Sequence, residues 1–158
     1  MAGFGVATDH PYLHEKSTFV SLPATTAAAE RAYAMAGVGP ADIDMAEVHD
    51  CFTITEILDI EDLGFVEKGK GGPASLAGET ALDGRIPINP SGGLLAKGHP
   101  IGATGVAQLT ECWWQLREEA GERQVAIRSG NALQHNVGGR GSGVSVVNIL
   151  SREPVSTG

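Results

Sequence analysis

Residues 89–105 read NPSGGLLAKGHPIGATG, and five of these seventeen residues are glycines. Glycine is costly in backbone entropy, so this density indicates chain reversals or close approach by a ligand. Directly afterwards, Val106, Leu109 and Trp113 fall at helical spacing, which places the end of the loop at a helix N-terminus. Free amides and the helix dipole favour negative charge there, so His99 is a candidate oxyanion stabiliser. A glycine-rich turn with an incidental exposed histidine fits the local sequence equally well.

Two further stretches narrow the interpretation: AEVHDCF at residues 46–52 and LQHNVGG at residues 133–139. Together with residues 89–105, they carry a resemblance to the thiolases. The glycine–histidine–proline signature is similar to the one near the C-terminus of thiolases. The other two stretches resemble the branch of the sterol carrier protein thiolases and their archaeal and bacterial relatives. The resemblance covers nearly the whole chain, but it corresponds only to the C-terminal half of a full thiolase.

The composition is that of an ordinary globular protein of 158 residues, with 42% apolar and 19% charged side chains. A single domain over residues 1–158 is therefore expected. The net charge of -8, without a Lys/Arg cluster, excludes a nucleic-acid surface. No apolar run approaches the ~20 residues of a membrane span, and no signal peptide is visible. The only cysteines are Cys51 and Cys112, so we expect a cytoplasmic protein with free thiols.

Hydrophobic periodicity and breaker residues predict strands and helices in alternation. The predicted strands are 3–7, 43–48, 86–89, 131–135 and 144–150, and the predicted helices are 23–36, 52–63 and 106–119. Gly37 is expected to cap the first helix at its C-terminus, and Asp50 to cap the second at its N-terminus. Residues 65–84 are predicted to be a polar surface excursion, and residues 151–158 a frayed tail.

This order predicts an α/β domain with a mixed, mostly parallel five-stranded sheet and helices on both faces. Only the last two strands are expected to pair antiparallel. The resemblance implies the same architecture, as the C-terminal half of the thiolase fold. Ligands generally bind where parallel strands end. We therefore expect His49, Cys51, His99 and His135, each at a predicted strand exit, to converge there.

Such a set of side chains suits chemistry on a thioester. Forming a carbon–carbon bond requires removal of a proton from the α-carbon and a held oxyanion. Imidazole N–H groups and helix-terminal amides can donate to an oxyanion, each lowering the barrier by ~3 kcal/mol. A thiol near imidazoles and a helix N-terminus, as Cys51 is, can act as base and then as acid, while His49 helps hold the enolate oxygen. Cys112 is expected to be a small core residue.

The resemblance implies a role for each residue. His99 would activate the acyl-accepting cysteine of the N-terminal half and contact an oxyanion, and His49 stands where many thiolases have asparagine. The loop after His135 lacks the proton-shuttling cysteine of other thiolases, so Cys51 of the HDCF motif would take over. The residues expected to contact the substrate are Gly93, His135 and Gly138. For His135, hydrogen bonding to a neighbouring carbonyl is an equally good alternative.

One departure from the family pattern concerns the nucleophile, because the chain has no candidate for the acyl-accepting cysteine. Covalent catalysis needs its nucleophile, so the chain alone is expected to be inactive. An N-terminal thiolase half or a second subunit, in a homo- or hetero-oligomer, would supply it and cover an exposed apolar face. Acyl-CoA and CoA are expected as substrates, with no resident cofactor and no metal. His10 and His14 have metal-site spacing, but Pro11 lies between them and a third ligand is lacking.

Three functions remain open from the sequence. The leading hypothesis is the C-terminal catalytic half of a thiolase-type acyltransferase, which makes or cleaves a 3-oxoacyl-CoA. A thiolase-like lyase, cleaving a side-chain acyl-CoA by a retro-aldol reaction with an OB-fold acyl-CoA-binding partner, would need no acylated cysteine. The third possibility is a non-catalytic acyl-CoA-binding or assembly subunit.

Overall fold

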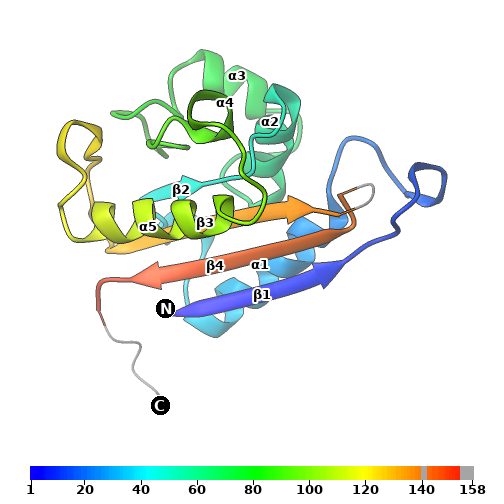
Figure 1. Cartoon of the computed structure of the whole chain (residues 1–158), viewed down its shortest axis with the longest axis horizontal. Coiled ribbons are helices and arrows are strands. Elements are labelled where there is room, and N and C mark those ends of the chain that lie inside the picture. Colours follow the sequence, from blue (N-terminus) through cyan, green and yellow to red (C-terminus); the bar gives the residue numbers. More distant parts are fainter. Residues whose placement is uncertain (140–141, 154–158) are drawn as a thin grey trace.

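A computed structural model describes residues 1–139 and 142–153 and places a four-stranded sheet at the centre (Figure 1). Its strands are β1 (Gly3–Thr8), β2 (Met45–Glu47), β3 (Asn131–Gly138) and β4 (Val144–Ser151), in the order β1-β4-β3-β2. Strand β4 is antiparallel to both β1 and β3, whereas β2 and β3 are parallel. The α/β class and the mixed sheet are confirmed. The expectation of a mostly parallel sheet is wrong, because β4 returns between β1 and β3.

The fifth predicted strand, residues 86–89, is reduced to a single parallel bridge between Ala46 and Ile88. The segment does lie along β2, since the Ala46 amide donates to the Pro87 carbonyl and the Asn89 amide donates to the Ala46 carbonyl. Pro87 has no N–H to donate before the bridge. After it, the Val48 amide donates to the side chain of Asn89, and the Val48 carbonyl accepts from the side chain of Gln108, so the ladder does not continue. The sheet therefore has four strands rather than five.

Helices cover both faces of the sheet, as predicted (Figure 1). Helix α1 (Pro23–Ala36) lies on β1 and β4, and its buried side chains are almost all alanines. A Cβ at Gly5 would stand 1.9 Å from the carbonyl oxygen of Ala28, so this glycine permits the close contact. Gly37 ends α1 in the left-handed conformation expected of a C-terminal cap.

Helix α5 (Thr104–Leu116) packs on the opposite face, against β2 and β3. It begins and ends earlier than the predicted helix 106–119, because its last residue is Leu116 and Glu118 already has a positive φ of 61°. Cys112 is fully buried between α5 and the sheet, with Met45 and Ala132. The prediction that Cys112 is a core residue is therefore confirmed.

The other helices gather beyond the β2 edge of the sheet (Figure 1): α2 (Thr53–Asp62), α3 (Gly71–Leu76) and α4 (Gly93–Lys97). Short 3₁₀ turns occur at Leu13–Glu15, Pro40–Asp42 and Gly121–Arg123. Helix α3 lies inside the predicted excursion 65–84 and packs on α2, with Gly71 and Ala74 buried. Residues 65–84 are thus partly a packed element rather than only a polar surface loop.

A set of large apolar side chains is exposed on β1 and along the outer side of α5. Phe4 and Val6 of β1 alternate with the glycines that face α1, so they lie on the face that also carries α5. Val106 is 65% exposed and Trp113 is 54% exposed on α5. This surface agrees with the expectation that the chain exposes an apolar face. Within the described residues, no helix is long and apolar enough to cross a bilayer.

The predicted frayed tail does not begin at residue 151. Ser151 is the last residue of β4, and the Arg152 amide donates to the carbonyl of Gly130 at 2.8 Å. The Arg152 guanidinium also donates to the Leu116 carbonyl, which ties this end of the chain to α5. Residues 154–158 lie outside the described part.

Candidate active site

Two of the predicted site histidines meet at the head of α5. His49 lies two residues beyond β2, and His99 lies in the turn between α4 and α5. Their ring centroids are 5.0 Å apart, with the ring planes at 80° in an edge-to-face contact. His49 is buried, whereas His99 is exposed. The predicted convergence of sequence-distant residues is therefore confirmed for this pair.

The surroundings of His99 assign its tautomer. The hydroxyl of Thr104 donates to the Pro100 carbonyl at 3.1 Å, which uses its single proton. The same oxygen lies 2.7 Å from His99 Nδ1, so it accepts a hydrogen bond from the Nδ1–H group. The neutral ring then carries a lone pair on Nε2. His99 is thus oriented to take up a proton from a group placed beside it.

His49 is held in its neutral form. Burial, followed by the neighbouring positive charges that His135 and His99 can carry, lowers its pKa to about 4. Its Nδ1 atom is buried without a hydrogen-bond partner among the described residues. A neutral imidazole has one N–H group to donate and no charge to balance. His49 therefore suits the role of a hydrogen-bond donor near an oxyanion.

We expect the ring protons of His49 to titrate with a midpoint near pH 4. The unfolded chain has a His pKa of ~6.5 and takes up the proton first, so folding stability falls as pH drops from ~6.5 to 4. NMR titration of the ring C2–H resonance measures this midpoint directly. A His49→Gln variant assigns the resonance and should show a flatter stability profile across that window. A midpoint above pH 6 would contradict the burial argument.

Cys51 lies between His49 and the start of α2. Its sulfur is half-buried, and the hydroxyl of Thr55 in the first turn of α2 lies 3.7 Å away. Phe52 precedes the first helical residue, so Cys51 stands beside unpaired amides of the helix N-terminus. The proton-shuttling role of Cys51 stays a prediction.

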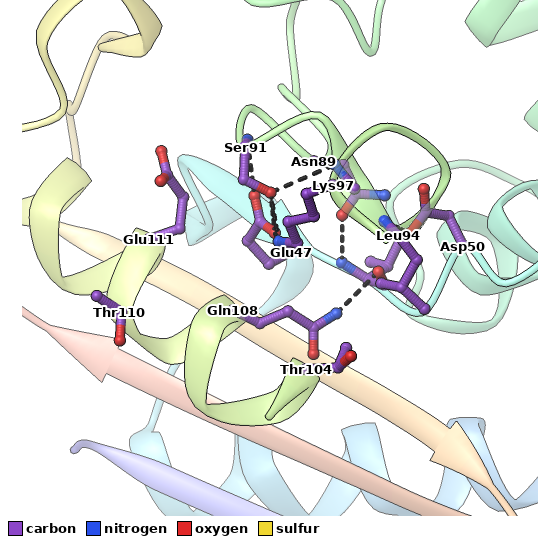
Figure 2. A network of polar contacts seen from close by, with 12 residues as sticks. Glu47, Asp50, Asn89, Ser91, Leu94, Lys97, Thr104, Gln108, Thr110 and Glu111 are labelled. Carbon is purple, nitrogen blue, oxygen red and sulfur yellow. Dashed lines mark hydrogen bonds and ion pairs between the residues drawn. The ribbon is translucent and has the colours of Figure 1, made fainter. Parts of the chain in front are cut away.

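The prediction that Asp50 caps the N-terminus of α2 is wrong. Its side chain binds the N-terminus of α4 instead. Its carboxylate accepts from the amides of Leu94 at 2.7 Å and Leu95 at 3.3 Å (Figure 2). The N-cap position of α2 is Phe52, which makes no side-chain cap. A buried carboxylate at the N-terminus of α4 fixes the start of the loop that leads to His99.

Gly93 leaves the space that the Asp50 carboxylate occupies, and it does not lie in an open site. Its φ is +64°, and a Cβ would lie 2.1 Å from Asp50 Oδ2. Gly93 is itself buried. The contact of Gly93 with a substrate stays a prediction. Its observed role is to leave room for the carboxylate of Asp50.

Replacing Gly93 by alanine is expected to lower the free energy of unfolding by about 2–3 kcal/mol. The cost has two sources, the left-handed backbone and the overlap with the carboxylate. Urea denaturation measures it. Gly37→Ala is the matched control, because Gly37 has a similar φ of +69° but nothing within 4 Å of its Cβ position. Equal losses in the two variants would show that the contact with Asp50 is unimportant.

The base of the loop is held by a buried carboxylate from β2. Glu47 accepts from the hydroxyl of Ser91 at 2.7 Å and from its amide at 3.0 Å, and lies 3.3 Å from the ammonium of Lys97 (Figure 2). Burial raises the pKa of Glu47, while Lys97 and Ser91 oppose that rise. From the other side, the amide of Gln108 in α5 donates to the Val48 carbonyl at 2.9 Å. Sequence reasoning missed these polar contacts, although polar residues on a helix predicted to be buried are a usable signal.

His135 is sealed inside the core. Its Nε2 lies 3.0 Å from the Thr25 hydroxyl and 3.2 Å from the Ser145 hydroxyl, and its Nδ1 lies 3.4 Å from the Asp59 carboxylate. Asp59 and His135 are both fully buried. The ring therefore does not reach the surface, and this burial argues against direct contact with a substrate. The alternative of a structural histidine with local polar partners accounts for its position.

A cleft of about 460 Å³ opens between the start of α5 and the ends of β3 and β4. Ile101 and Gly102, which follow His99, form one wall, and Asn136 and Gly138 form part of the other. Gly138 thus lies where a ligand could approach the site, although its role in binding remains a prediction. Among the described residues, no cluster of three or more His, Cys, Asp or Glu side chains is arranged to hold a metal ion.

Comparison with known proteins gives a consistent result. The family model described as thiolase C-terminal domain-like matches residues 5–152. The chain is 55% identical over 140 residues to an acetyl-CoA acetyltransferase of Methanothermobacter thermautotrophicus, covering 89% of the chain and 36% of the relative. It is 46% identical over 142 residues to sterol carrier protein 2 of Oryctolagus cuniculus, covering 88% and 26%. The chain therefore spans about a third or less of the length of these relatives.

Two solved structures share the fold at low sequence identity. The Ltp2-ChsH2(DUF35) aldolase superimposes with a TM-score of 0.78 at 23% identity, over 96% of this chain and 39% of that one. A monomeric SCP2-thiolase like protein type 1 from Mycobacterium smegmatis gives 0.68 at 20% identity, over 97% and 29%. These likenesses concern the fold alone. With the family model matching nearly its whole length, the chain belongs to the thiolase C-terminal domain-like family.

Proposed function

We propose that this chain is the C-terminal catalytic half of a thiolase-type acyltransferase, which condenses acyl-CoA units or cleaves a 3-oxoacyl-CoA with CoA. The observation that carries the proposal is the contact between the His49 and His99 rings at the head of α5, next to an open cleft. The exposed ring of His99 can act as a base through Nε2, and the buried neutral ring of His49 beside it can donate a hydrogen bond. That pairing suits a reaction in which a thiol loses a proton and a thioester oxygen gains charge.

Each residue then has a separate task. His99 takes the proton from an acyl-accepting thiol through Nε2, because Nδ1 already donates to Thr104. His49 donates to the oxygen of the thioester enolate, and its low pKa keeps it neutral at pH 7. In condensation, the acyl group of the first acyl-CoA passes to the acyl-accepting thiol, and the proton held by His99 goes to the leaving CoA thiolate. Cys51, as the thiolate, then takes the α-proton of the second acyl-CoA. The enolate carbon attacks the acyl group, and the displaced thiolate takes the proton back from Cys51. Thiolysis follows the same steps in reverse.

The acyl-accepting thiol must come from a second polypeptide segment, since Cys51 and the buried Cys112 are the only thiols here. The exposed apolar face on β1 and α5 is the surface that such a segment would cover. Phe4, Val106 and Trp113 stand exposed on this face. We therefore propose an N-terminal thiolase half as the partner, and acyl-CoA and CoA as the ligands.

The test is a chimera in which this chain follows the part of the Methanothermobacter acetyl-CoA acetyltransferase that lies outside the match. Consumption of acetoacetyl-CoA in the presence of CoA is measured by absorbance, with the intact archaeal enzyme as the reference. We expect turnover by the chimera and none by the 158-residue chain alone. A folded, monodisperse chimera that binds acetoacetyl-CoA but does not consume it would contradict the proposal.

A further inference from the structure

Asn89 occupies an unusual position at the entrance to the glycine-rich loop. It is only 8% exposed, and its φ of 51° is in the left-handed region, which non-glycine residues adopt at a cost. Asparagine tolerates this conformation better than most residues do. The backbone is fixed on both sides, because its amide donates to the Ala46 carbonyl and its carbonyl accepts from the Gly92 amide, each at 2.8 Å.

The side chain of Asn89 joins two further segments. Its Oδ1 accepts from the Val48 amide at 2.8 Å, directly before His49 (Figure 2). Its Nδ2 donates to the carboxylate of Glu56 in α2 at 2.9 Å. The Val48 carbonyl is held from the other side by Gln108 of α5. Both polar groups of the Val48 backbone are thus bound by side chains, which leaves the following residue little freedom.

Only a carboxamide makes both side-chain contacts of Asn89. Aspartate has the same shape but lacks the donor and would place a second carboxylate against Glu56. Burial raises the pKa of Glu56, and the hydrogen bond from Asn89 opposes that rise, as the largest of the lowering influences. The nearby carboxylates of Asp50, Asp59 and Glu47 raise the same pKa. Asn89 is therefore the side chain that opposes the rise in the pKa of Glu56 at this crowded point.

We propose that Asn89 is a positioning residue that fixes His49, the Cys51 end of α2 and the loop to His99 in one geometry. The inference rests on the function proposed above for its effect on turnover, but its structural content is independent of that function. Asn89 touches no part of the cleft wall given by Ile101, Gly102 and Gly138. Asn89 acts on the site through its hydrogen bonds to Val48 and Glu56.

The test compares three variants: Asn89→Asp, Glu56→Gln, and the two combined. Asn89→Asp should lower kcat of the chimera by about 10²-fold with a much smaller change in KM, because misplaced groups lose rate more than binding. Glu56→Gln alone should change kcat less than about threefold, since the amide oxygen of glutamine still accepts from Asn89. The double variant keeps the net charge and reverses donor and acceptor, because the new carboxamide in α2 donates to the new carboxylate in the loop. It should restore most of the loss.

Asn131→Asp is the matched control. Asn131 is also 8% exposed, and its side-chain carboxamide donates to the backbone carbonyl of Asp42. It lies at the opposite end of β3 from the site. The control should lose stability without a change in kcat at temperatures where it remains folded. If Asn131→Asp lowers kcat as much as Asn89→Asp does, the effect is general destabilisation and the proposal fails.

A second readout separates this inference from the proposed function. In the 158-residue chain, the ring resonances of His49 and His99 should shift together in Asn89→Asp and return in the double variant. Amide exchange at Val48 should accelerate in the single variant and slow again in the double one. If the chimera is inactive but these signals respond as described, the positioning role stands and the proposed function fails. If neither ring responds to Asn89→Asp, the positioning role is overturned whatever the activity shows.

Discussion

Replacing His99 by alanine is expected to lower thiolysis of acetoacetyl-CoA by the chimera at least about 10³-fold. Two contributions are lost together, the base that deprotonates the acyl-accepting thiol and a donor to an oxyanion, and each is worth about 10²–10³ in rate. The ring is exposed and its loss removes only its contacts with His49 and Thr104, so the variant should still fold. The measurement is kcat/KM for acetoacetyl-CoA, with binding of the substrate followed separately by calorimetry.

His10→Ala is the matched control for the loss of an imidazole. The His10 side chain is 65% exposed and lies 3.6 Å from the carboxylate of Glu15. Its removal should leave thiolysis unchanged within about twofold. Undiminished turnover by His99→Ala, with His10→Ala equally active, would remove His99 from the mechanism. It would also leave the contact with His49 without a chemical purpose.

The meeting of His49 and His99 could be predicted from the sequence because it follows from topology. His49 follows an apolar strand, and His99 lies in the turn that leads into an amphipathic helix, so each side chain is placed by an element that periodicity reveals. Parallel strands deliver such positions to one edge of a sheet. The parallel alignment that matters here is between β2 and residues 86–89, which meet at the bridge between Ala46 and Ile88, because these two segments lead to His49 and to the loop of His99.

The partners of buried polar side chains could not be predicted in the same way. Asp50 precedes α2 in sequence, and an N-cap there was reasonable, but its carboxylate reaches the amides of α4 instead. Helix α4 has five residues, too few to show a period, so this competing N-terminus was invisible. His135 was equally ambiguous, because its burial depends on Thr25, Asp59 and Ser145 from three other elements. Long-range packing decides such cases, and a single sequence does not report it.

The same reasoning applies to the strand count. Residues 86–89 were predicted as a strand from their apolar character, and they do run beside β2. The pairing is limited to one bridge, by Pro87 on one side and by the side chains of Asn89 and Gln108, which bind the Val48 backbone, on the other. The missing N–H of Pro87 is known from the sequence, whereas the two side-chain contacts depend on long-range packing.

Replacing Cys51 by alanine is expected to lower thiolysis and condensation by about 10³-fold while leaving substrate binding nearly unchanged. General acid–base catalysis by a positioned group contributes typically 10²–10⁴-fold, and no other described thiol is exposed to take over. A retro-aldol cleavage of a side-chain acyl-CoA would respond differently, because it needs no proton exchange with this sulfur. The variant therefore separates the two reactions that the sequence left open, measured with acetoacetyl-CoA and with a β-hydroxy side-chain acyl-CoA.

Cys112→Ala supplies the control, because it removes the other thiol from a place where it has no access to substrate. Cys112 is fully buried on α5, donates weakly to the Leu133 carbonyl at 3.6 Å, and has a pKa raised by burial and by the charge of Glu47. Its loss should reduce stability by about 1–2 kcal/mol through the cavity left behind, with turnover within about twofold of the parent. If Cys51→Ala retains thiolysis while Cys112→Ala behaves as expected, the proton must move through another group. The shuttle assigned to the HDCF motif would then be wrong, although the assignment of His99 would survive.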